Sequence, residues 1–301
     1  MLTVAIMYTN GRFHDARQNN ASTQMQAFNY GTAAFEGMRA CYDEDAHHWL
    51  LFRPDQHYAR LKRSANAIGI DLRETYDRFV AIIATLIRRN DIRSDVYIRP
   101  LVYRDEKGVG LTRPSGYGLS VFIQSMPAAP PRAFRACIVP QRRPVDKSCS
   151  VKLSGNYLLS FFAHHAAVQN GFDVGLLCST TGFVSEASVM NLFFVKDGKL
   201  FTPSLACGTL DGITRKSILE LAGCELGIPV TDGKYRTGRL LSADELFLTG
   251  TGSGINYVRQ IESQKFALNG QRLLAPKLRN LYDDAIHGRI PGRMDWLLSV
   301  R

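Results

Sequence analysis

The chain has 301 residues, 45% of them hydrophobic and 21% charged, which is typical of a folded globular protein and excludes a disordered or fibrous one. This length exceeds the usual size of a single hydrophobic core, so we expect two domains. A net charge of +10 suits the binding of nucleic acid or of an anionic ligand, but the basic residues are spread along the chain and form no basic arm. We therefore do not expect nucleic-acid binding.

The cysteines and the apolar segments narrow the class of protein further. The six cysteines are far apart, form no C-x-x-C pair and have no histidine at metal-ligand spacing, so no metal site is predicted. The first residues lack the basic and apolar regions of a signal peptide, and no apolar run reaches the roughly 18 residues of a membrane span. We expect a cytoplasmic protein with free thiols and no membrane association.

The first part of the chain alternates predicted strands and amphipathic helices. One helix opens at Pro54, because proline suits the first helical turn. Its apolar residues recur at the three- and four-residue spacing of one buried stripe: Tyr58, Leu61, Ala65 and Ile68. Arg60 falls outside that stripe, so the local pattern alone places it on a solvated face. The other elements predicted here are strands at 3–7, 47–53, 96–103 and 118–124 and a helix at 75–90.

The strand predicted at 96–103 contains an arginine. Its alternate side chains, Tyr97, Arg99 and Tyr103, share or flank one face. An arginine in so apolar a strand is costly unless it meets a carboxylate or another anion. Arg99 is therefore a candidate for carboxylate recognition.

Three prolines within Met126–Pro131 favour an extended linker. We place the domain boundary here, with a first domain at 1–125, a linker at 126–132 and a second domain at 133–301. In the second domain we predict helices at 157–169 and 215–226, strands at 174–178, 192–195, 200–202 and 245–249, a hairpin turn at Asp197-Gly198, and helical packing in the tail at 276–282 and 295–300.

The stretch Val151–Tyr157 carries the strongest chemical signal. It places Lys152 on a short apolar approach and follows it with a Ser-Gly-Asn turn and Tyr157. A lysine forms a Schiff base with a carbonyl when a sheltered site lowers its pKa. Further along, Glu186 lies among small polar residues just before an apolar strand. A lysine, a tyrosine and a buried glutamate are the groups that pyridoxal phosphate needs at its aldehyde, its ring oxygen and its ring nitrogen.

Two turns suit an anionic ligand. Residues Thr209–Thr214 precede a predicted helix, where free N–H groups and a threonine hydroxyl can bind an anion. An ordinary helix N-cap would explain the same residues. Residues Gly250–Gly254 form a second glycine and threonine turn directly after a strand. Two such turns and an upstream arginine match the two negative charges of a phosphate monoester.

With these residues in order, the chain resembles the branched-chain amino-acid aminotransferases, within the fold type IV class of pyridoxal-phosphate enzymes. The matching motifs are Tyr30-Gly31 with Phe35-Glu36-Gly37, Tyr97-Ile98-Arg99-Pro100-Leu101, Lys152 with Gly155-Asn156-Tyr157, Ser185-Glu186 with Asn191-Leu192-Phe193, Gly212-Ile213-Thr214-Arg215, and Thr249-Gly250-Thr251. The resemblance covers most of the chain, from Tyr30 to about Val258. It implies a mixed α/β fold with a small N-terminal α/β domain and a larger C-terminal pseudo-barrel domain that binds the cofactor.

The resemblance also implies a role for each matching residue. Lys152 would hold pyridoxal phosphate covalently and move the α-proton, Glu186 would pair with the ring nitrogen, and Tyr157 would hydrogen-bond the phenolic oxygen. The other cofactor-binding matches are Arg60, Leu210, Ile213, Thr214, Gly250 and Thr251. The resemblance thus implies that Arg60 binds the cofactor, in place of the solvated face that the local pattern suggests. The substrate-binding matches are Tyr30, Phe35, Gly37, Tyr97, Arg99, Leu111, Thr251 and Gly252.

The implied reaction is a ping-pong transamination from an aliphatic, branched-chain L-amino acid to 2-oxoglutarate. Arg99 would bind the side-chain carboxylate when glutamate is the partner, and aromatic residues would hold aliphatic side chains. A homodimer is implied by similarity alone, and some substrate residues would reach across its interface.

Two departures from the family pattern concern the substrate. After Thr251 the family usually has Ala-Ala-Glu, whereas this chain has Gly252-Ser253-Gly254, and Asn29 stands where the family often has histidine. Three alternatives share the scaffold: a specialised transaminase with another amino donor, a D-amino-acid aminotransferase, and an aminodeoxychorismate-lyase-like enzyme that eliminates pyruvate. A basic nucleic-acid-binding protein that uses this fold is the alternative outside the enzymes.

Overall fold

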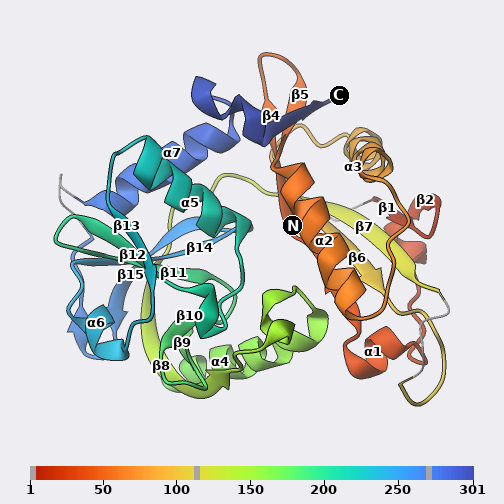
Figure 1. Cartoon of the computed structure of the whole chain (residues 1–301). Helices are drawn as coiled ribbons and strands as arrows, with labels where there is room; N and C mark the ends of the chain where they lie inside the picture. The colour runs from red at the N-terminus through yellow and green to blue at the C-terminus, as the bar shows by residue number, and fades with distance from the viewer. Residues whose placement is uncertain (1–4, 112–115, 269–272) are drawn as a thin grey trace. The chain divides into compact units, whose positions relative to one another are not determined.

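The computed structural model describes residues 5–111, 116–268 and 273–301 (Figure 1). The chain divides into two compact units. The first runs to Ala129 and adds Val151–Gly155 and Ala285–Arg301, and the second consists of Pro130–Ser150 and Asn156–Asp284. The segment that carries Lys152 thus belongs to the first unit, although the residues on both sides of it belong to the second.

The first unit contains one antiparallel sheet with strand order β17-β5-β4-β6-β7-β1-β2, and β3 pairs with β6. Its described strands are β1 (Ile6–Thr9), β2 (Arg12–Asp15), β3 (Ala33–Phe35), β4 (Met38–Asp43), β5 (His48–Phe52), β6 (Val96–Tyr103), β7 (Gly118–Ser125) and β17 (Leu297–Val300). Its helices are α1 (Gln26–Tyr30), α2 (Pro54–Ala67) and α3 (Tyr76–Asn90).

Helix α2 confirms the predicted apolar stripe but not the predicted exposure of Arg60. Leu61 and Ala65 are completely buried. Arg60 is only 5% exposed, because its guanidinium meets the buried carboxylate of Glu36. The solvated position suggested by the local pattern is therefore wrong, and the reason is a partner that is distant in sequence.

Helix α3 and strand β6 match their predicted ranges closely. The side chain of Thr75 accepts a hydrogen bond from the N–H of Arg78 and caps α3, whose predicted apolar face is buried. Strand β6 alternates strictly between buried and partly exposed residues, with Tyr97, Arg99 and Tyr103 on the partly exposed side.

The predicted helical packing at 295–300 is wrong. A 3₁₀ segment, η5 (Pro291–Trp296), leads into strand β17, which pairs antiparallel with β5 so that Val300 lies opposite Trp49. The hydrogen-bonding edge of β5 satisfies the backbone of this tail, and tertiary pairing overrides the local pattern.

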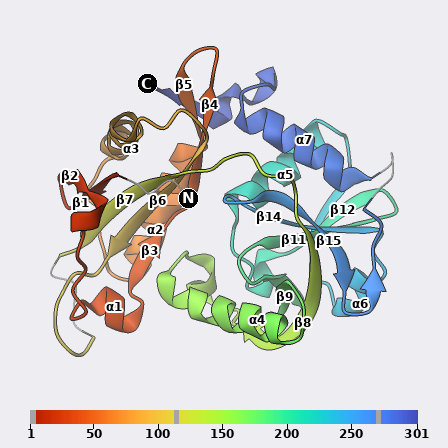
Figure 2. The ribbon, with the colours of Figure 1, turned by 180° about the vertical axis from the view of Figure 1, so that it is seen from behind.

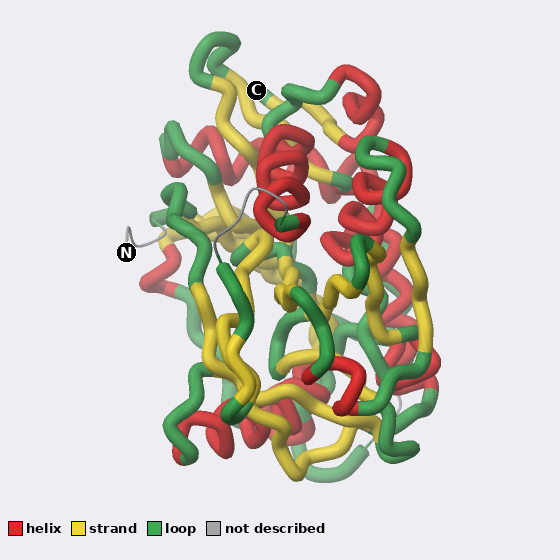
Figure 3. The backbone as a smooth tube through the Cα atoms, turned by 90° about the vertical axis from the view of Figure 1, so that its left-hand side faces the viewer, coloured by secondary structure: helices red, strands yellow, loops and turns green. Residues whose placement is uncertain are grey.

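The second unit contains a mixed sheet with strand order β10-β9-β8-β15-β14-β11-β12-β13, and β16 pairs with β15. Its described strands are β8 (Ala133–Arg143), β9 (Val174–Ser179), β10 (Val184–Ala187), β11 (Asn191–Lys196), β12 (Lys199–Pro203), β13 (Val230–Gly233), β14 (Glu245–Gly250), β15 (Gly254–Ile261) and β16 (Gln264–Lys265). The sheet curls, because β10 also contacts β11 and β12, and this agrees with the expected pseudo-barrel. Helices and strands are mixed in both units, as the predicted α/β class requires (Figure 3).

The helices of the second unit are α4 (Tyr157–Gln169), α5 (Ile213–Cys224), α6 (Thr237–Leu241) and most of α7 (Leu274–Ile286), whose last two residues belong to the first unit. Helix α4 has the predicted bounds and packs on β8 and β9 (Figure 2). Helix α5 begins two residues earlier than predicted, so Ile213 and Thr214 form its first turn. The predicted hairpin turn is confirmed, since Asp197 and Gly198 both have positive φ between β11 and β12.

Candidate active site

In the first unit, the backbone of Lys152 is held by two neighbouring segments. Its N–H donates to the hydroxyl of Ser64 on α2 at 3.0 Å, and its carbonyl accepts from the N–H of Phe35 at 3.2 Å. Its Nζ lies 4.7 Å from the centre of the Phe35 ring. Burial, followed by the positive charge of Arg60, lowers the pKa of Lys152 to about 8. Near neutral pH a useful fraction of this amine is therefore unprotonated and nucleophilic.

Beside Lys152, Arg60 belongs to a buried cluster with Glu36 and His57. Nε of Arg60 donates to Oε1 of Glu36 at 2.5 Å, and Nη2 donates to Oε2 at 2.8 Å. Nδ1 of His57 lies 2.8 Å from the same Oε2. Burial alone would raise the pKa of Glu36, but Arg60 and His57 outweigh burial and hold that pKa well below its usual range. The sequence patterns assign no role to His57, and Glu36 enters them only as part of a motif.

The predicted substrate residues of the first unit fall into two groups. Arg99 donates from Nη2 to the Tyr97 hydroxyl at 2.7 Å, and its guanidinium carbon lies 4.6 Å from the centre of the Phe35 ring. A side chain at Gly37 would clash with the Tyr97 hydroxyl, so a larger residue there would force the Tyr97 ring to move. This cation lined by aromatic rings can receive a carboxylate or an aliphatic chain.

The second group lies around α1 and the loop after β6. The hydroxyl of Tyr30 accepts a hydrogen bond from the N–H of Gly110 at 2.8 Å. Tyr30 is 40% exposed and Leu111 is 73% exposed. These two apolar side chains face solvent in the single chain, unlike the Phe35 group.

In the second unit, Glu186 on β10 is the centre of a buried hydrogen-bond network. Its Oε1 lies 3.0 Å from Nη2 of Arg143, while its Oε2 accepts from Nδ2 of Asn191 at 2.9 Å and from the N–H of Leu210 at 3.1 Å. The positive charge of Arg143 balances the buried carboxylate. Neither residue has a local sequence signal that reveals this role. Arg143 is one of a basic pair with Arg142, and Asn191 appears only as part of a motif.

The predicted phosphate residues other than Arg60 lie at two chain turns of this unit. Helix α5 has Gly212 as its N-cap and no side chain that caps it, so the N–H groups of its first turn point out of the helix end. A side chain at Gly212 would overlap Oδ1 of Asn191. Thr214 in this first turn is 2% exposed. Such a helix end binds anions through its N–H groups and its dipole.

The second turn joins β14 to β15. It contains Gly250, Thr251 and Gly252, and the N–H of Ser253 donates to the carbonyl of Gly250 at 3.2 Å. Tyr157, the remaining predicted cofactor residue, is the first residue of α4 and is partly buried. Both turns and Tyr157 thus lie where chain segments begin or end, as binding residues commonly do.

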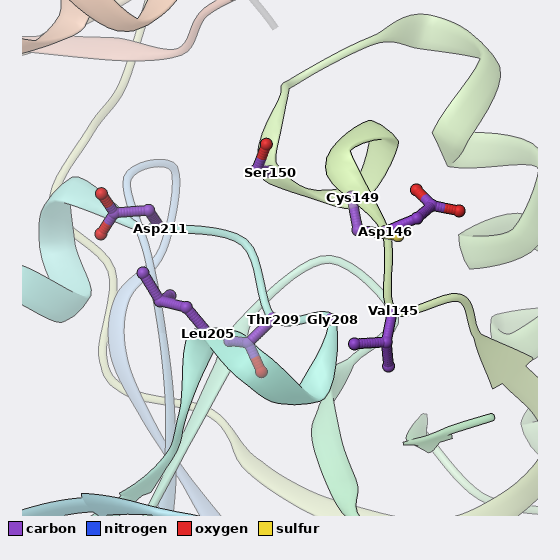
Figure 4. Close-up of a pocket in the computed structure, with 8 residues that line it drawn as sticks. All are labelled: Val145, Asp146, Cys149, Ser150, Leu205, Gly208, Thr209 and Asp211. Atoms are coloured by element: carbon purple, nitrogen blue, oxygen red, sulfur yellow. The ribbon is translucent and has the colours of Figure 1, made fainter. Parts of the chain in front are cut away.

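A small cavity of roughly 60 Å³ also lies in the second unit (Figure 4). It is lined by the segment before Ser150 and by the chain from Leu205 to Asp211. The thiol of Cys149 is turned toward the backbone there and donates to the carbonyl of Pro144 at 3.0 Å. The cavity has room for a few water molecules and borders the predicted anion-binding turn at Thr209 and Asp211.

One cluster resembles a metal site. Cys41, Asp95 and His287 place one possible ligand atom each within 4.8 Å of one another. Arg39, however, lies 3.7 Å from Asp95 and supplies a positive charge where a cation would have to bind. We therefore interpret the cluster as an ion-pair network.

These residues fit pyridoxal phosphate. The lowered pKa of Lys152 suits an amine that must attack an aldehyde, and the uncapped start of α5 suits a phosphate. The buried, hydrogen-bonded carboxylate of Glu186 suits a protonated ring nitrogen.

Comparison with known proteins gives the family. Residues 33–261 match the family model "Amino-transferase class IV". A probable branched-chain-amino-acid aminotransferase from Synechocystis sp. is 34% identical over 98% of this chain and 97% of its own. A branched-chain aminotransferase from the archaeon Thermoproteus uzoniensis, crystallised with norvaline, has a TM-score of 0.91 at 29% identity and covers 98% of this chain and 99% of its own. The branched-chain amino acid aminotransferase of Thermobaculum terrenum in its PLP-form also has a TM-score of 0.91, at 26% identity, and covers 99% of this chain and 98% of its own.

The chain belongs to the class IV aminotransferases. It is a pyridoxal-phosphate-dependent aminotransferase, and its substrates are amino acids and 2-oxo acids. The alternatives of a D-amino-acid aminotransferase, a lyase or a nucleic-acid-binding protein are not favoured by these relatives. In the part of the chain that the structure describes, no helix has both the length and the apolar character needed to cross a membrane.

Proposed function

We propose that the protein transfers the amino group of an aliphatic, branched-chain L-amino acid to 2-oxoglutarate. The observation that carries this proposal is the placement of Lys152 and Arg99 against the same aromatic ring, that of Phe35. An amine of lowered pKa and a carboxylate-binding cation thus share one aromatic wall. The names of the relatives, which are branched-chain aminotransferases, support the choice of substrate.

The reaction proceeds in two halves, in which a donor amino acid leaves as a 2-oxo acid and a second 2-oxo acid takes up the amino group. Pyridoxal phosphate supplies the aldehyde and an electron-accepting ring. Lys152 would hold the cofactor through its Nζ, and its amine, when free, would accept and return the α-proton of the substrate. Glu186 would keep the ring nitrogen protonated, and Tyr157 would hydrogen-bond the phenolic oxygen.

By the family resemblance, the phosphate would be held by residues that supply N–H groups, a hydroxyl or a positive charge: Arg60, Leu210, Ile213, Thr214, Gly250 and Thr251. The start of α5, which no side chain caps, supports this assignment. The substrate is held by a mixture of aromatic, cationic and small residues: Tyr30, Phe35, Gly37, Tyr97, Arg99, Leu111, Thr251 and Gly252. Arg99 binds the side-chain carboxylate of glutamate, and Phe35 and Tyr97 contact aliphatic side chains.

A panel of amino donors with 2-oxoglutarate, followed by single-turnover spectra of the bound cofactor, tests the substrate. We expect valine, leucine and isoleucine to react faster than D-amino acids and aromatic donors. Failure of all three would favour a specialised transaminase with another donor. The sequence Gly252-Ser253-Gly254 motivates this second candidate, because it removes methyl groups and a carboxylate from a turn that is predicted to contact the substrate.

We further propose a homodimer in a reducing cytoplasm. Helix α4 exposes three large apolar side chains, Leu158, Phe161 and Phe162, at 48% to 60%. Such a patch is costly in water and suits a second copy of the chain. The six cysteines are all free thiols, which suits a reducing compartment. Sedimentation of the wild type and of Phe161→Glu tests the dimer: we expect a dimer that the charge dissociates, and a monomeric wild type would contradict it.

A further inference from the structure

Helix α2 carries a buried polar stripe beside its apolar one. His57, Arg60 and Ser64 lie three and four residues apart, so they share one face of the helix. Their exposed fractions are 0%, 5% and 0%. Three buried polar side chains on one helix face are unfavourable unless each has a partner, so the partners indicate what the stripe is for.

The partners are Glu36 and Lys152. His57 and Arg60 both bind the carboxylate of Glu36, which is completely buried. Ser64 accepts the backbone N–H of Lys152. The residue before Glu36, Phe35, donates its own N–H to the carbonyl of Lys152. Helix α2 therefore connects the carboxylate of Glu36 and the backbone of Lys152 in one hydrogen-bonded frame.

We propose that Glu36 is a positioning residue of the transamination site: its carboxylate fixes the plane of the Arg60 guanidinium and balances its charge beside the amine of Lys152. This inference rests on the proposed function, because it explains how the residues assigned to cofactor binding are held. Two parallel hydrogen bonds from Nε and Nη2 leave the guanidinium one orientation. A single bond to a neutral acceptor would allow it to rotate.

The charges around Lys152 agree with this role. Within the first unit, Lys152 interacts with Arg60, Glu36, Tyr97 and Arg99. After burial, Arg60 has the largest effect and lowers the pKa of Lys152, whereas the negative charge of Glu36 raises it. Glu36 stays ionised because Arg60 and His57 hold its pKa below the usual range. The carboxylate of Glu36 thus offsets part of the positive charge of Arg60, so Lys152 lies beside an ion pair and not beside an isolated cation.

His57 completes the arrangement without adding charge. Burial lowers its pKa despite the neighbouring carboxylate, so the ring is neutral near pH 7. A carboxylate can only accept, so Nδ1 carries the proton and donates to Glu36. Nε2 is buried and has no hydrogen-bond partner among the described residues. The neutral imidazole of His57 therefore orients the carboxylate of Glu36 without offsetting the negative charge that balances Arg60.

Opposite charge effects distinguish this role from a merely structural one. The visible absorption of the bound cofactor changes with protonation of the nitrogen that joins it to Lys152, so a pH titration of the full-length holoenzyme gives a midpoint. We expect Glu36→Gln to lower that midpoint by about one pH unit and Arg60→Met to raise it. We also expect Glu36→Gln to weaken cofactor binding by about tenfold, measured by adding pyridoxal phosphate to the apoenzyme. Equal midpoints in Glu36→Gln and wild type, or a shift in the same direction in both variants, would overturn the proposal.

Two further variants keep the test decisive if Glu36→Gln does not fold. Glu36→Asp retains the charge on a shorter side chain, so we expect weaker cofactor binding with an unchanged midpoint. Wild-type affinity in that variant would overturn the positioning role. Glu245→Gln is the matched control: Glu245 is similarly buried but binds the N–H groups of Leu274 and Ala275, so neither quantity should change. Wild-type enzyme that binds cofactor yet rejects branched-chain donors would refute the proposed substrate alone and leave this titration valid.

Discussion

Nη2 of Arg143 lies 3.0 Å from Oε1 of Glu186, and both side chains are buried. The other oxygen of Glu186 accepts hydrogen bonds from Asn191 and Leu210, so the carboxylate is held on both sides. This network fixes the direction and the charge of the one acid predicted to face the cofactor ring. It also joins β10 to the chain just before α5, because Leu210 precedes the N-cap Gly212 by two residues.

Neutralising this acid should separate binding from chemistry. We expect Glu186→Gln to retain bound cofactor, because Lys152 and the turn after β14 lie outside this network and a glutamine oxygen can still accept the N–H of Leu210. The donor half-reaction should slow by about a hundredfold or more, because proton removal needs a protonated ring nitrogen. Single-turnover spectra with a branched-chain amino acid measure this rate, with Glu245→Gln as the control for a buried glutamate. An unchanged rate would remove Glu186 from its proposed role.

Removing the cation should act on stability. Arg143→Met leaves Glu186 buried without its counter-charge and also loses the hydrogen bond from Nε of Arg143 to the carbonyl of Gly208. We expect the free energy of unfolding of the second unit to fall by about 3 kcal/mol. Urea unfolding followed by circular dichroism measures the change. Arg143→Lys restores the charge but not the two-pronged geometry and should recover part of the loss. Equal stability of all three proteins would contradict the role of the ion pair.

Two glycines of the α5 region provide a matched pair. A methyl group at Gly212 would overlap Oδ1 of Asn191, whereas one at Gly223 meets nothing within 4 Å. We expect Gly212→Ala to lower the free energy of unfolding by about 2 kcal/mol and to weaken cofactor binding, because either the start of α5 or Asn191, which is hydrogen-bonded to Glu186 and Leu210, must shift. Gly223→Ala should instead stabilise the helix by about 0.5 to 1 kcal/mol. Similar effects of both substitutions would show that helix propensity, not the contact with Asn191, governs this turn.

Prediction from the sequence succeeded where local chemistry decides the structure. The positive-φ turn at Asp197-Gly198, the helix predicted at 75–90 and the bounds of α4 all depend on residues close in sequence. Each is decided by hydrogen bonds or backbone angles that the segment itself supplies. The apolar stripe of α2 was predictable for the same reason.

The failures involve partners that are distant in sequence. The burial of Arg60 depends on Glu36, and the strand at Leu297–Val300 depends on the free edge of β5. Arg143 likewise acquires a role only because β8 and β10 bring it to Glu186. No local pattern predicts these contacts, although the family resemblance already implied that Arg60 binds the cofactor and does not lie on a solvated face.

The pH dependence of cofactor attachment follows from the pKa of Lys152. The unprotonated amine attacks the aldehyde, so attachment to the apoenzyme should accelerate as pH rises through about 8. An ordinary lysine, with a pKa of 10.5, would still be accelerating well above that pH. Stopped-flow absorbance from about pH 6 to about pH 10 measures the profile, and Lys152→Ala should show no lysine-bound absorption at all. A midpoint near that of an ordinary lysine would contradict the sheltered amine.

The acid stability of the first unit should depend on Asp95. Its Oδ1 accepts from the N–H of Tyr42 at 3.0 Å, and its Oδ2 lies 3.3 Å from Nε2 of His287 and 3.7 Å from Arg39. Burial opposes the charged form, but the hydrogen bonds from His287 and Tyr42 prevail, and the pKa of Asp95 is lowered. The carboxylate therefore links β4 to the segment that leads into β17.

A lowered carboxyl pKa stabilises the fold above the pKa of the unfolded chain, and this contribution is lost as the pH falls through the folded value. We therefore expect Asp95→Asn to lower the free energy of unfolding by about 1 kcal/mol at pH 7 and to differ less from the wild type below about pH 4. Both tryptophans, Trp49 and Trp296, are buried in the first unit, so their fluorescence during urea unfolding reports on this unit. A difference between the two proteins that stays constant from about pH 7 to about pH 3 would show that Asp95 acts through packing and not through its charge.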